Sequence, residues 1–540
     1  MTPTAAPSAL RSPRTGLGSP LNDRQVWWIS FLLFSALGAV WAMSMPLLVG
    51  PDEPAHAGKA AAVVRGELTW VARQDITGTD AANPTRSEIT LRVPRAYAEL
   101  DYACIALPPL QPASCMTAIP RRTDTVEVIN SAGAYPPVFY ALVGWPSLIL
   151  PPSKAIYAMR LTNVALCAAL VASALVAGRR ADLSGTTIVG IAAALTPMAI
   201  FLMAVVNPNA LEVVAALGTL VAALEVVRAD RPTTRSILRF VVAASLLTLA
   251  RPLSVVVLVT VAALVAIAAL DPSRARALLR DRRVRIGALP LGAAAAFAGF
   301  WLLYAEPQRA LWGRPRPGIP LGEALRGSLS LLPWRVRQMI GVFGWIDAHA
   351  PLPVSMIVWW LVVVSVLVAA ALIVGSARRK LAVTLSVAAV IGFTLSEATQ
   401  VERIGFVWQG RYSLPLAVAV PTLAAWVIGT SGRIPERTAR MAGSATIASL
   451  AAIVLVSYIV VMRRYVVGIP SPSLAYLFEG VWQPKLPKLL LFALATLVTA
   501  AIGLWLARLA RPDPAVARSA GGQPALVGCR PASSSESLTV

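Results

Sequence analysis

Charged residues are scarce in this sequence: they make up 14% of its 540 residues, against 57% hydrophobic residues. A soluble domain has nearer ~25% charged residues, so this composition excludes a soluble globular protein. No segment shows the alternation of a membrane-spanning strand, which argues against a β-barrel. Histidine occurs only twice and cysteine four times, without any CxxC motif. The chemistry of this protein must therefore rest on few residues.

Long apolar runs are what the sequence has instead. Runs of about eighteen or more apolar residues predict helices that cross a membrane and satisfy their own backbone hydrogen bonds. We predict an all-α polytopic membrane protein with about twelve transmembrane helices. The predicted spans are residues 26–49, 153–177, 186–206, 210–227, 236–250, 253–270, 286–305, 354–375, 381–398, 412–429, 441–462 and 487–508.

Two long polar loops interrupt the predicted transmembrane domain, residues 26–508. They cover residues 51–133 and 306–353. The segment that follows the first loop, residues 134–152, is apolar but contains five prolines. Proline interrupts helices, so we expect this segment to be interfacial or re-entrant rather than a span.

Arginines set the predicted orientation in the membrane. The short loops "GRRAD", "RADRPTTR" and "SARRK" lie on one side, whereas the turn "VVNPNA" on the other side has no basic residue. Basic loops are cytoplasmic in most membrane proteins. We therefore place both long loops outside, and residues 1–25 and a disordered tail, residues 509–540, in the cytoplasm. One pair, Arg463 and Arg464, disagrees with this orientation.

The net charge of +22 is also explained by arginines in the loops that orient the helices in the membrane. In a soluble protein it would suggest nucleic acid, but here it belongs to the loops, and no nucleic-acid recognition module is present. Cys104 and Cys115 share the first long loop, so they can form a disulfide if that loop is extracytoplasmic. We predict a bacterial plasma-membrane protein whose partners include the lipid bilayer and no nucleic acid.

Two acids follow the first predicted span, in the stretch "PDEPAHAGKAAAVVRGEL". Asp52 and Glu53 open a short helix there, and His56 and Lys59 follow on the face of Asp52. One interpretation is structural: an acid caps the free amides of this helix. The other is chemical: Asp52 or Glu53 is a base that deprotonates a hydroxyl, beside cations that bind a phosphate. Asp52 is also the candidate ligand of a divalent cation, although two acids alone are a weak metal motif.

Other polar residues lie near predicted span ends. Arg411, with Gln409 beside it, is either a phosphate or sugar contact or an arginine that reaches to the interface. Arg251 stands between two spans and needs a partner, either lipid phosphate or another residue. Trp345 and Asp347 suit sugar binding, although tryptophan is also common as an interfacial anchor.

These stretches together resemble a known family. The matching stretches are "PDEPAHAGKAAAVVRGEL", "AYPPVFYALVGWP", "VVNPNALEV", "GVFGWIDAHAPLP" and "QGRYSLPL", between Pro51 and about Pro415. They resemble the bacterial membrane family called domain of unknown function 2142. More broadly, the acidic motif of the first outer loop resembles the GT-C glycosyltransferases, which use polyprenyl-phosphate sugars.

The resemblance implies roles for particular residues. Asp52 falls on the catalytic acid of the superfamily, and Glu53 and His56 fall within the same motif. Tyr135 belongs to a "YPP" element that precedes the second span, and Arg160 at the start of that span is expected to face the donor phosphate. The implied fold is GT-C-like, and the implied enzyme is an inverting transferase.

The leading hypothesis is therefore a glycosyltransferase at the outer face of the plasma membrane. It would move a sugar from a polyprenyl-phosphate donor to an envelope glycan or lipid acceptor. No cofactor is required, and a divalent cation is an open alternative. Two rival hypotheses remain: a transporter or flippase of lipid-linked saccharides, and a non-catalytic envelope assembly protein. The sequence leaves the sugar, the acceptor and the pathway open.

Overall fold

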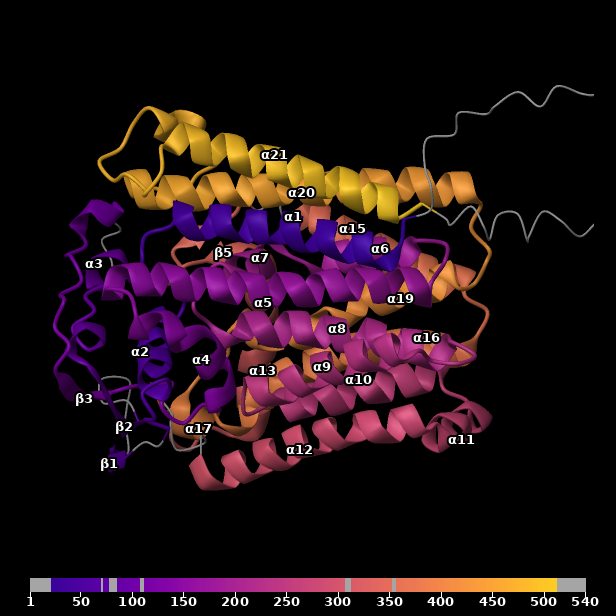
Figure 1. Cartoon of the computed structure of the whole chain (residues 1–540), viewed down its shortest axis with the longest axis horizontal. Coiled ribbons are helices and arrows are strands. Elements are labelled where there is room, and N and C mark those ends of the chain that lie inside the picture. Colours follow the sequence, from indigo (N-terminus) through magenta and orange to yellow (C-terminus); the bar gives the residue numbers. More distant parts are fainter. Residues whose placement is uncertain are drawn as a thin grey trace, which may run out of the picture.

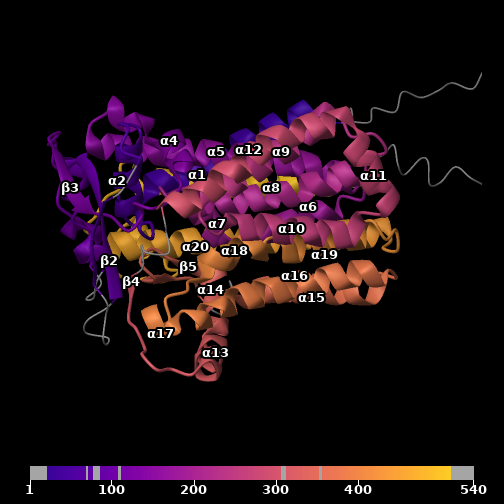
Figure 2. The same ribbon diagram turned by 90° about the horizontal axis from the view of Figure 1, so that it is seen from below.

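The long helices of this protein lie side by side in one bundle, seen from two directions in Figure 1 and Figure 2. The computed structural model describes residues 21–68, 71–76, 85–106, 111–305, 312–351 and 356–511. The predicted segments 1–20 and 512–540 lie outside the described residues, so the predicted disorder of the tail stays a prediction.

Eight helices of the described residues are long and apolar enough to cross a membrane. A bent pair, α6 (Thr186–Ala194) and α7 (Pro197–Met203), makes a ninth if it is one span broken by 66°. Two shorter apolar helices are α10 (Ser254–Ala269) and α15 (Ile357–Ile373). The eight are α1 (Asp23–Ser44), α5 (Pro152–Ala181), α8 (Pro208–Arg228), α12 (Arg282–Ala305), α16 with its 3₁₀ turn (Ala377–Thr399), α18 and α19 (Gly410–Gly429), α20 (Glu436–Val467) and α21 (Lys488–Leu509).

Every predicted span falls on one of these helices or on α9 (Thr234–Ala250). The two arginines of α9, Arg235 and Arg239, shorten its apolar part. The prediction of an all-helical polytopic membrane protein is confirmed. The count of about twelve spans stays a prediction, because length and composition alone support eight or nine. Helix α8 is central, with 94% of its spanning window buried.

A small sheet joins the two long loops at one end of the bundle, on the left in Figure 1. Strand β2 pairs with β1 and β3 from the first loop and with β4 from the second, all antiparallel. The strands are β1 (Val71–Ile76), β2 (Thr85–Pro94), β3 (Thr125–Ile129) and β4 (Trp312–Gly313). The sequence analysis did not anticipate this sheet, since short strands in a polar loop leave little periodic signal.

The proline-rich segment forms two short helices at the same end. Helix α4 (Pro137–Gly144) is followed by a 3₁₀ helix, Trp145–Leu148. Neither is long enough to cross a bilayer. Gly144 packs so closely on α2 (Glu53–Val63) that a Cβ there would lie 2.3 Å from a backbone oxygen of that helix. The segment thus supports α2 from the side.

The second long loop folds over the same end. Its helices α13 (Leu321–Ser330) and α14 (Leu332–Gly341) precede a hairpin of β5 (Val342–Phe343) and β6 (Ala348–His349). Further along the chain, the short helix α17 (Val401–Ile404) follows α16. A buried ion pair between Arg335 and Glu397 ties α14 to the end of α16.

The first long loop is cross-linked internally. A disulfide joins Cys104, in the short helix α3 (Ala103–Ala106), to Cys115. The side chain of Arg464 at the end of α20 donates hydrogen bonds to the backbone carbonyls of Ile105 and Gln111, inside the loop that this disulfide closes. Arg464 is fully buried, so its basic charge serves packing. This explains why Arg464 departs from the charge pattern of the other loops, but it does not account for Arg463.

Candidate active site

Three residues with strained backbones meet beside the start of α2. Leu48 and Asp52 have φ angles of 66° and 57°, and Ile346 has 67°; they are the only non-glycine residues with positive φ in the described ranges. Such residues rarely adopt this conformation. The indole of Trp345 donates a hydrogen bond to the Leu48 carbonyl at 3.1 Å, which brings the two segments together. Backbone strain gathers at functional sites, so we take this place as the candidate active site.

Asp52 holds an ion pair with an arginine from the far half of the chain. Nη2 of Arg411, in α18 (Gly410–Ala417), donates to Oδ2 of Asp52 at 2.6 Å. The Arg411 side chain is 4% exposed and the Asp52 side chain is 44% exposed. The pair therefore joins a buried cation to a carboxylate that a ligand can reach.

The interpretation of Asp52 as a plain helix cap is wrong. Asp52 does occupy the N-cap position of α2, but its side chain makes no capping hydrogen bond. The left-handed backbone at this residue turns its carboxylate toward Arg411 instead. The local sequence pattern suited a cap, but a tertiary contact with α18 takes the carboxylate.

A second arginine adjoins this pair. Arg251, between α9 and α10, forms an ion pair of 3.1 Å with Glu212 in α8. Its guanidinium also donates to the Tyr135 hydroxyl at 3.4 Å. The guanidinium carbons of Arg251 and Arg411 each lie 5.0 Å from the centre of the Tyr412 ring. Two cations therefore flank one aromatic ring, an arrangement that cation–π attraction stabilises.

Both arginines keep hydrogen-bonding capacity to spare. Among the described residues, neither Nε–H of Arg251 nor that of Arg411 has a hydrogen-bond partner, although both atoms are buried. Leaving a buried charged donor unpaired costs about 1–3 kcal/mol or more. An anionic oxygen that entered the cluster would supply the missing partner. Arginine binds phosphate oxygens with two parallel hydrogen bonds, so this cluster suits a phosphate.

Glu53, the neighbour of Asp52, has a different environment. Its carboxylate accepts hydrogen bonds from Nε and Nη2 of Arg160 at 2.7 and 2.6 Å. It also accepts from the backbone N–H groups of Gly50 and Val206. Both side chains of the pair are 0% exposed. The structure thus brings the predicted base Glu53 and the predicted phosphate ligand Arg160 together as a closed pair.

His56 and Lys59 also point into the protein. Nδ1 of His56 lies 2.9 Å from the Tyr140 hydroxyl, and the imidazole is buried. Burial lowers the pKa of His56 to about 3; Asp52 opposes this shift and nearby arginines add to it. Burial lowers the pKa of Lys59 to about 8, and its ammonium donates to two backbone carbonyls. His56 is therefore neutral at pH 7, and its predicted role in binding the donor phosphate or substrate stays a prediction.

Trp345 lies at the candidate site, whereas Asp347 lies in the core beneath it. The ring of Trp345 stacks on Tyr102 with centroids 4.7 Å apart and planes at 8°. Burial raises the pKa of Tyr102, and the negative charge of nearby Asp52 adds to the shift. Asp347 forms an ion pair of 2.7 Å with buried Arg464. Asp347 is itself buried and supports the loop from beneath.

The structure places the remaining predicted residues around Asp52 as well. Gln409 and Arg411 line one small pocket together with Pro51. Tyr135 contacts both Arg251 and His56. The sequence analysis missed Tyr412, Tyr102, Tyr140 and Glu212 as site residues. Glu212 had a signal, since an ionisable residue inside a spanning helix indicates function or a partner.

A metal would find few ligands here. In the parts of the chain that the structure describes, no group of three or more His, Cys, Asp or Glu side chains could hold a metal ion. The partner of Asp52 is a cation, which repels a second one. The divalent cation remains an untested alternative.

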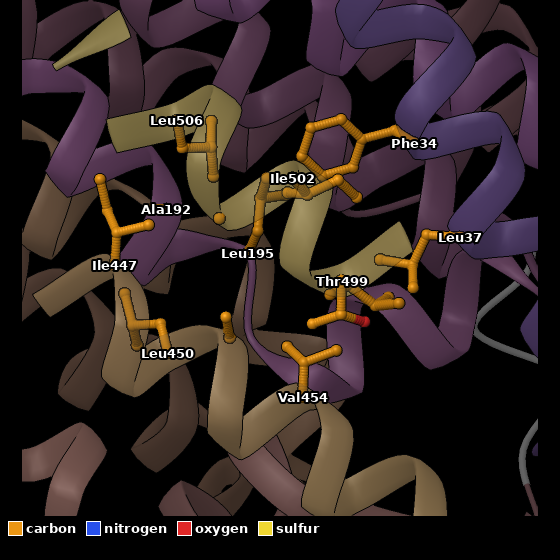
Figure 3. A pocket seen from close by; sticks show the side chains of 13 residues that line it. Phe34, Leu37, Ala192, Leu195, Ile447, Leu450, Val454, Thr499, Ile502 and Leu506 are labelled. Atoms are coloured by element: carbon orange, nitrogen blue, oxygen red, sulfur yellow. The ribbon is translucent and has the colours of Figure 1, made fainter. Parts of the chain in front are cut away.

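The void shown in Figure 3 lies elsewhere. Side chains of α1, α6, α20 and α21 line it, among them Phe34, Leu195, Leu450 and Thr499. No ionisable residue contributes to its lining. Its position halfway along the spanning helices suits apolar contents only. It lacks the groups that proton transfer or phosphate binding requires.

The described helices and this cluster define a polytopic helical membrane protein with a polar site at one end of its bundle. The chain belongs to the family described as predicted membrane protein (DUF2142), whose model matches residues 34–420. No curated protein matches the chain. Among solved structures it is similar to ArnT from Cupriavidus metallidurans bound to undecaprenyl phosphate, with 12% identity and a TM-score of 0.41 over 92% of this chain and 79% of that one.

Proposed function

We propose that this protein is a glycosyltransferase that takes a sugar from a polyprenyl-phosphate carrier. The acceptor is a glycan or lipid of the cell envelope, and the reaction takes place at the outer face of the plasma membrane. The observation that supports this best is the exposed Asp52 carboxylate, held at 2.6 Å by buried Arg411. A reachable base beside a preformed cationic cluster is what transfer from a sugar phosphate requires.

The proposed reaction is a single displacement. The acceptor hydroxyl oxygen attacks the anomeric carbon, the bond from that carbon to the phosphate oxygen breaks, and the configuration inverts. Asp52 takes the proton of the hydroxyl. The polyprenyl phosphate leaves with the bonding electron pair, and Arg411 and Arg251 stabilise its charge. Atoms and charges balance without a cofactor.

The membrane side of the site decides the class of donor. The positive-inside pattern predicts that Asp52 faces outward, where ATP and nucleotide sugars are normally absent. The disulfide between Cys104 and Cys115 in the same loop fits an oxidising compartment. A donor that is anchored in the membrane can reach this side.

The stacked pair of Tyr102 and Trp345 is the proposed sugar contact. Aromatic faces suit the apolar faces of sugar rings, and this pair lies near Asp52. Glu53, Arg160 and Lys59 are given supporting roles, because their charged groups are buried and already bonded to the protein. Asp52 is thus the single catalytic carboxylate of the proposal, and it acts as the base.

A transporter of lipid-linked saccharides is the second candidate function. The broken helix pair α6 and α7, with its 66° bend, is a feature that transporters use. The buried ion pair of Glu212 and Arg251 is the kind of intramembrane charge that marks a transport path. A transporter moves its substrate unchanged, so chemical turnover separates the two functions.

The first experiment is an envelope-glycan analysis in a deletion strain. The strain is complemented with wild type, with Asp52→Asn, or with Asp124→Asn, at matched membrane levels. Asp124 is the matched control, since it also pairs with an arginine at 2.6 Å but on the exposed surface of the same loop. We expect wild type and Asp124→Asn to restore the glycan and Asp52→Asn to fail.

A second measurement separates enzyme from transporter. Purified protein in detergent is given a pool of lipid-linked sugars together with an envelope glycan and lipid extract as the source of acceptor hydroxyls, and release of polyprenyl phosphate is measured. Detergent removes the two membrane sides, so a transporter releases nothing, whereas an enzyme releases polyprenyl phosphate. Full restoration of the glycan by Asp52→Asn would overturn the assignment of the base.

A further inference from the structure

A second polar pocket lies at the end of the bundle opposite to Asp52. It has a volume of about 450 Å³ and lies where α1 begins, α5 ends, α9 begins and α21 ends. Five arginines line it: Arg24, Arg179, Arg180, Arg235 and Arg511.

The acids of this pocket leave most of its positive charge uncompensated. Asp23 pairs with Arg180 at 2.7 Å. The Asp182 carboxylate accepts hydrogen bonds from Ser184 and Thr187 and serves as a local cap. Among the described residues, the other four arginines of the pocket form no ion pair or side-chain hydrogen bond. The pocket therefore carries a net charge of +3, from five arginines and two aspartates.

Several other arginines at this end of the bundle have hydrogen-bond or ion-pair partners inside the protein. Arg274 donates to backbone carbonyls at the end of α8. Arg378 pairs with Asp271, and Arg433 donates to the last turn of α15. Arginines that orient a membrane protein can therefore also have partners inside it. Arg24, Arg179, Arg235 and Arg511 have none among the described residues, and they line one polar cavity together.

Aromatic residues show the depth of the pocket in the membrane. Trp27 donates to Ser173 at 2.9 Å, and Trp28, on the second turn of α1, is 47% exposed. Tryptophan favours the level of the lipid headgroups. Leu183 and Leu509 line the same pocket, so apolar contacts for an acyl chain adjoin the arginines.

We propose that this pocket binds the phosphate headgroup of an anionic phospholipid from the leaflet on that side. Arginine forms paired, charge-assisted hydrogen bonds with phosphate, and basic pockets between spanning helices suit anionic lipid headgroups. The proposal is independent of the proposed transferase function. Bound lipid here would hold the starts of α1 and α9 against the end of α5.

The test measures lipid binding by the full chain directly. Delipidated protein in neutral detergent is titrated with dioleoylphosphatidylglycerol, dioleoylphosphatidylcholine or soluble glycerol phosphate, and bound ligand is counted by native mass spectrometry. The pocket variant and the control variant each lose three arginines at the same end, all of them exposed except Arg179, which is half-buried. The pocket variant is Arg24→Gln, Arg179→Gln and Arg235→Gln, and the control is Arg280→Gln, Arg282→Gln and Arg285→Gln.

We expect wild type and control to bind phosphatidylglycerol at least ~10-fold more tightly than the pocket variant, because each interfacial arginine adds to the attraction. Equal weakening in both variants would overturn the proposal, since surface charge would then explain binding. Glycerol phosphate that binds as tightly as the lipid would overturn the lipid source. Lipid binding that appears only after removal of residues 512–540 would mean that this segment, and not a lipid, occupies the pocket in the full chain. That result would overturn the proposal.

Discussion

Asp52 and Glu53 are neighbours, and each forms an ion pair with an arginine, yet the two pairs have opposite surroundings. The Glu53–Arg160 pair is 0% exposed on both sides, and backbone groups complete its hydrogen bonds. The Asp52–Arg411 pair has one buried partner and one carboxylate that is 44% exposed. The first pair is closed to ligands, and the second is open on the side of the acid.

The difference shows that two consecutive acids can have different roles, one in stability and the other in the proposed reaction. Glu53 is the first residue of α2 and points into the bundle, where it joins α2 to α5 and to the start of α8. Asp52 has a left-handed backbone and points out of the bundle. A buried charge needs its partner for stability, whereas the exposed carboxylate of Asp52 can be reached by a substrate. The predictions below test this division.

The largest expected effect is on folding, in Glu53→Gln. Removing one partner of a buried ion pair costs about 3–5 kcal/mol, because the other charge stays buried and unpaired. We expect Glu53→Gln to lower the thermal unfolding midpoint in detergent and the level of protein in the membrane. Asp124→Asn, which breaks an exposed ion pair, is the control and should leave both unchanged. Asp52→Asn should lower both less than Glu53→Gln, because its side-chain oxygen can still accept a hydrogen bond from Arg411. Equal losses in the two variants would contradict the division.

The second effect is on activity, in Arg411→Gln. Removing one preorganised group that stabilises developing charge lowers turnover by about 10²–10³-fold. Stability should change little, because the carboxylate left behind is exposed. The measurement is the initial rate of polyprenyl phosphate release, together with the unfolding midpoint. Arg95→Gln, which breaks the exposed pair with Asp124, is expected to retain wild-type turnover.

The third effect is a pH dependence of stability from His56. Its pKa is lowered to about 3 in the folded protein from the ordinary value of 6.5. The unfolded state therefore binds the proton more readily, and stability present above pH 6.5 is lost as the pH falls toward 3. The slope is at most about 1.4 kcal/mol per pH unit for one group.

The check on His56 is the unfolding midpoint between pH 7.5 and 5. We expect His56→Gln to flatten the dependence below pH 6.5. The groups that face the imidazole are Tyr135, Tyr140, Asp52, Arg251 and Arg411. Identical slopes in wild type and variant would show that His56 carries a proton in the folded protein.

The smallest effect concerns the aromatic pair beside Asp52. Stacked aromatic contacts contribute about 0.5–1.5 kcal/mol beyond their burial, so Trp345→Ala should raise KM by up to ~10-fold. Trp345→Phe keeps a stacking face and should recover most of this loss. Trp145→Ala, an exposed tryptophan at the same end, is the control. A change in kcat alone would place Trp345 outside the sugar-binding surface.

Much of the fold was predictable because a membrane-spanning helix has a local signal, a long run of apolar residues. Apolar length alone located the long apolar helices of the bundle, such as α1, α5, α8 and α21, but it did not find the short helices of the two long loops. The sheet of β1 to β4 was missed, because its strands are short and pair across residues far apart in the chain. Asp52 was found from its motif, but Tyr412 and Glu212 have no local pattern that links them to it.

The sequence by itself determined the membrane class, the positions of the spanning helices and the family of this protein. Only the tertiary structure decided which acid is open and which is closed. That choice depends on Arg160 and Arg411, which lie 107 and 359 residues away from their partners. Composition and periodicity report on neighbours in the chain, whereas the environment of a charge is set by helices that meet it in space.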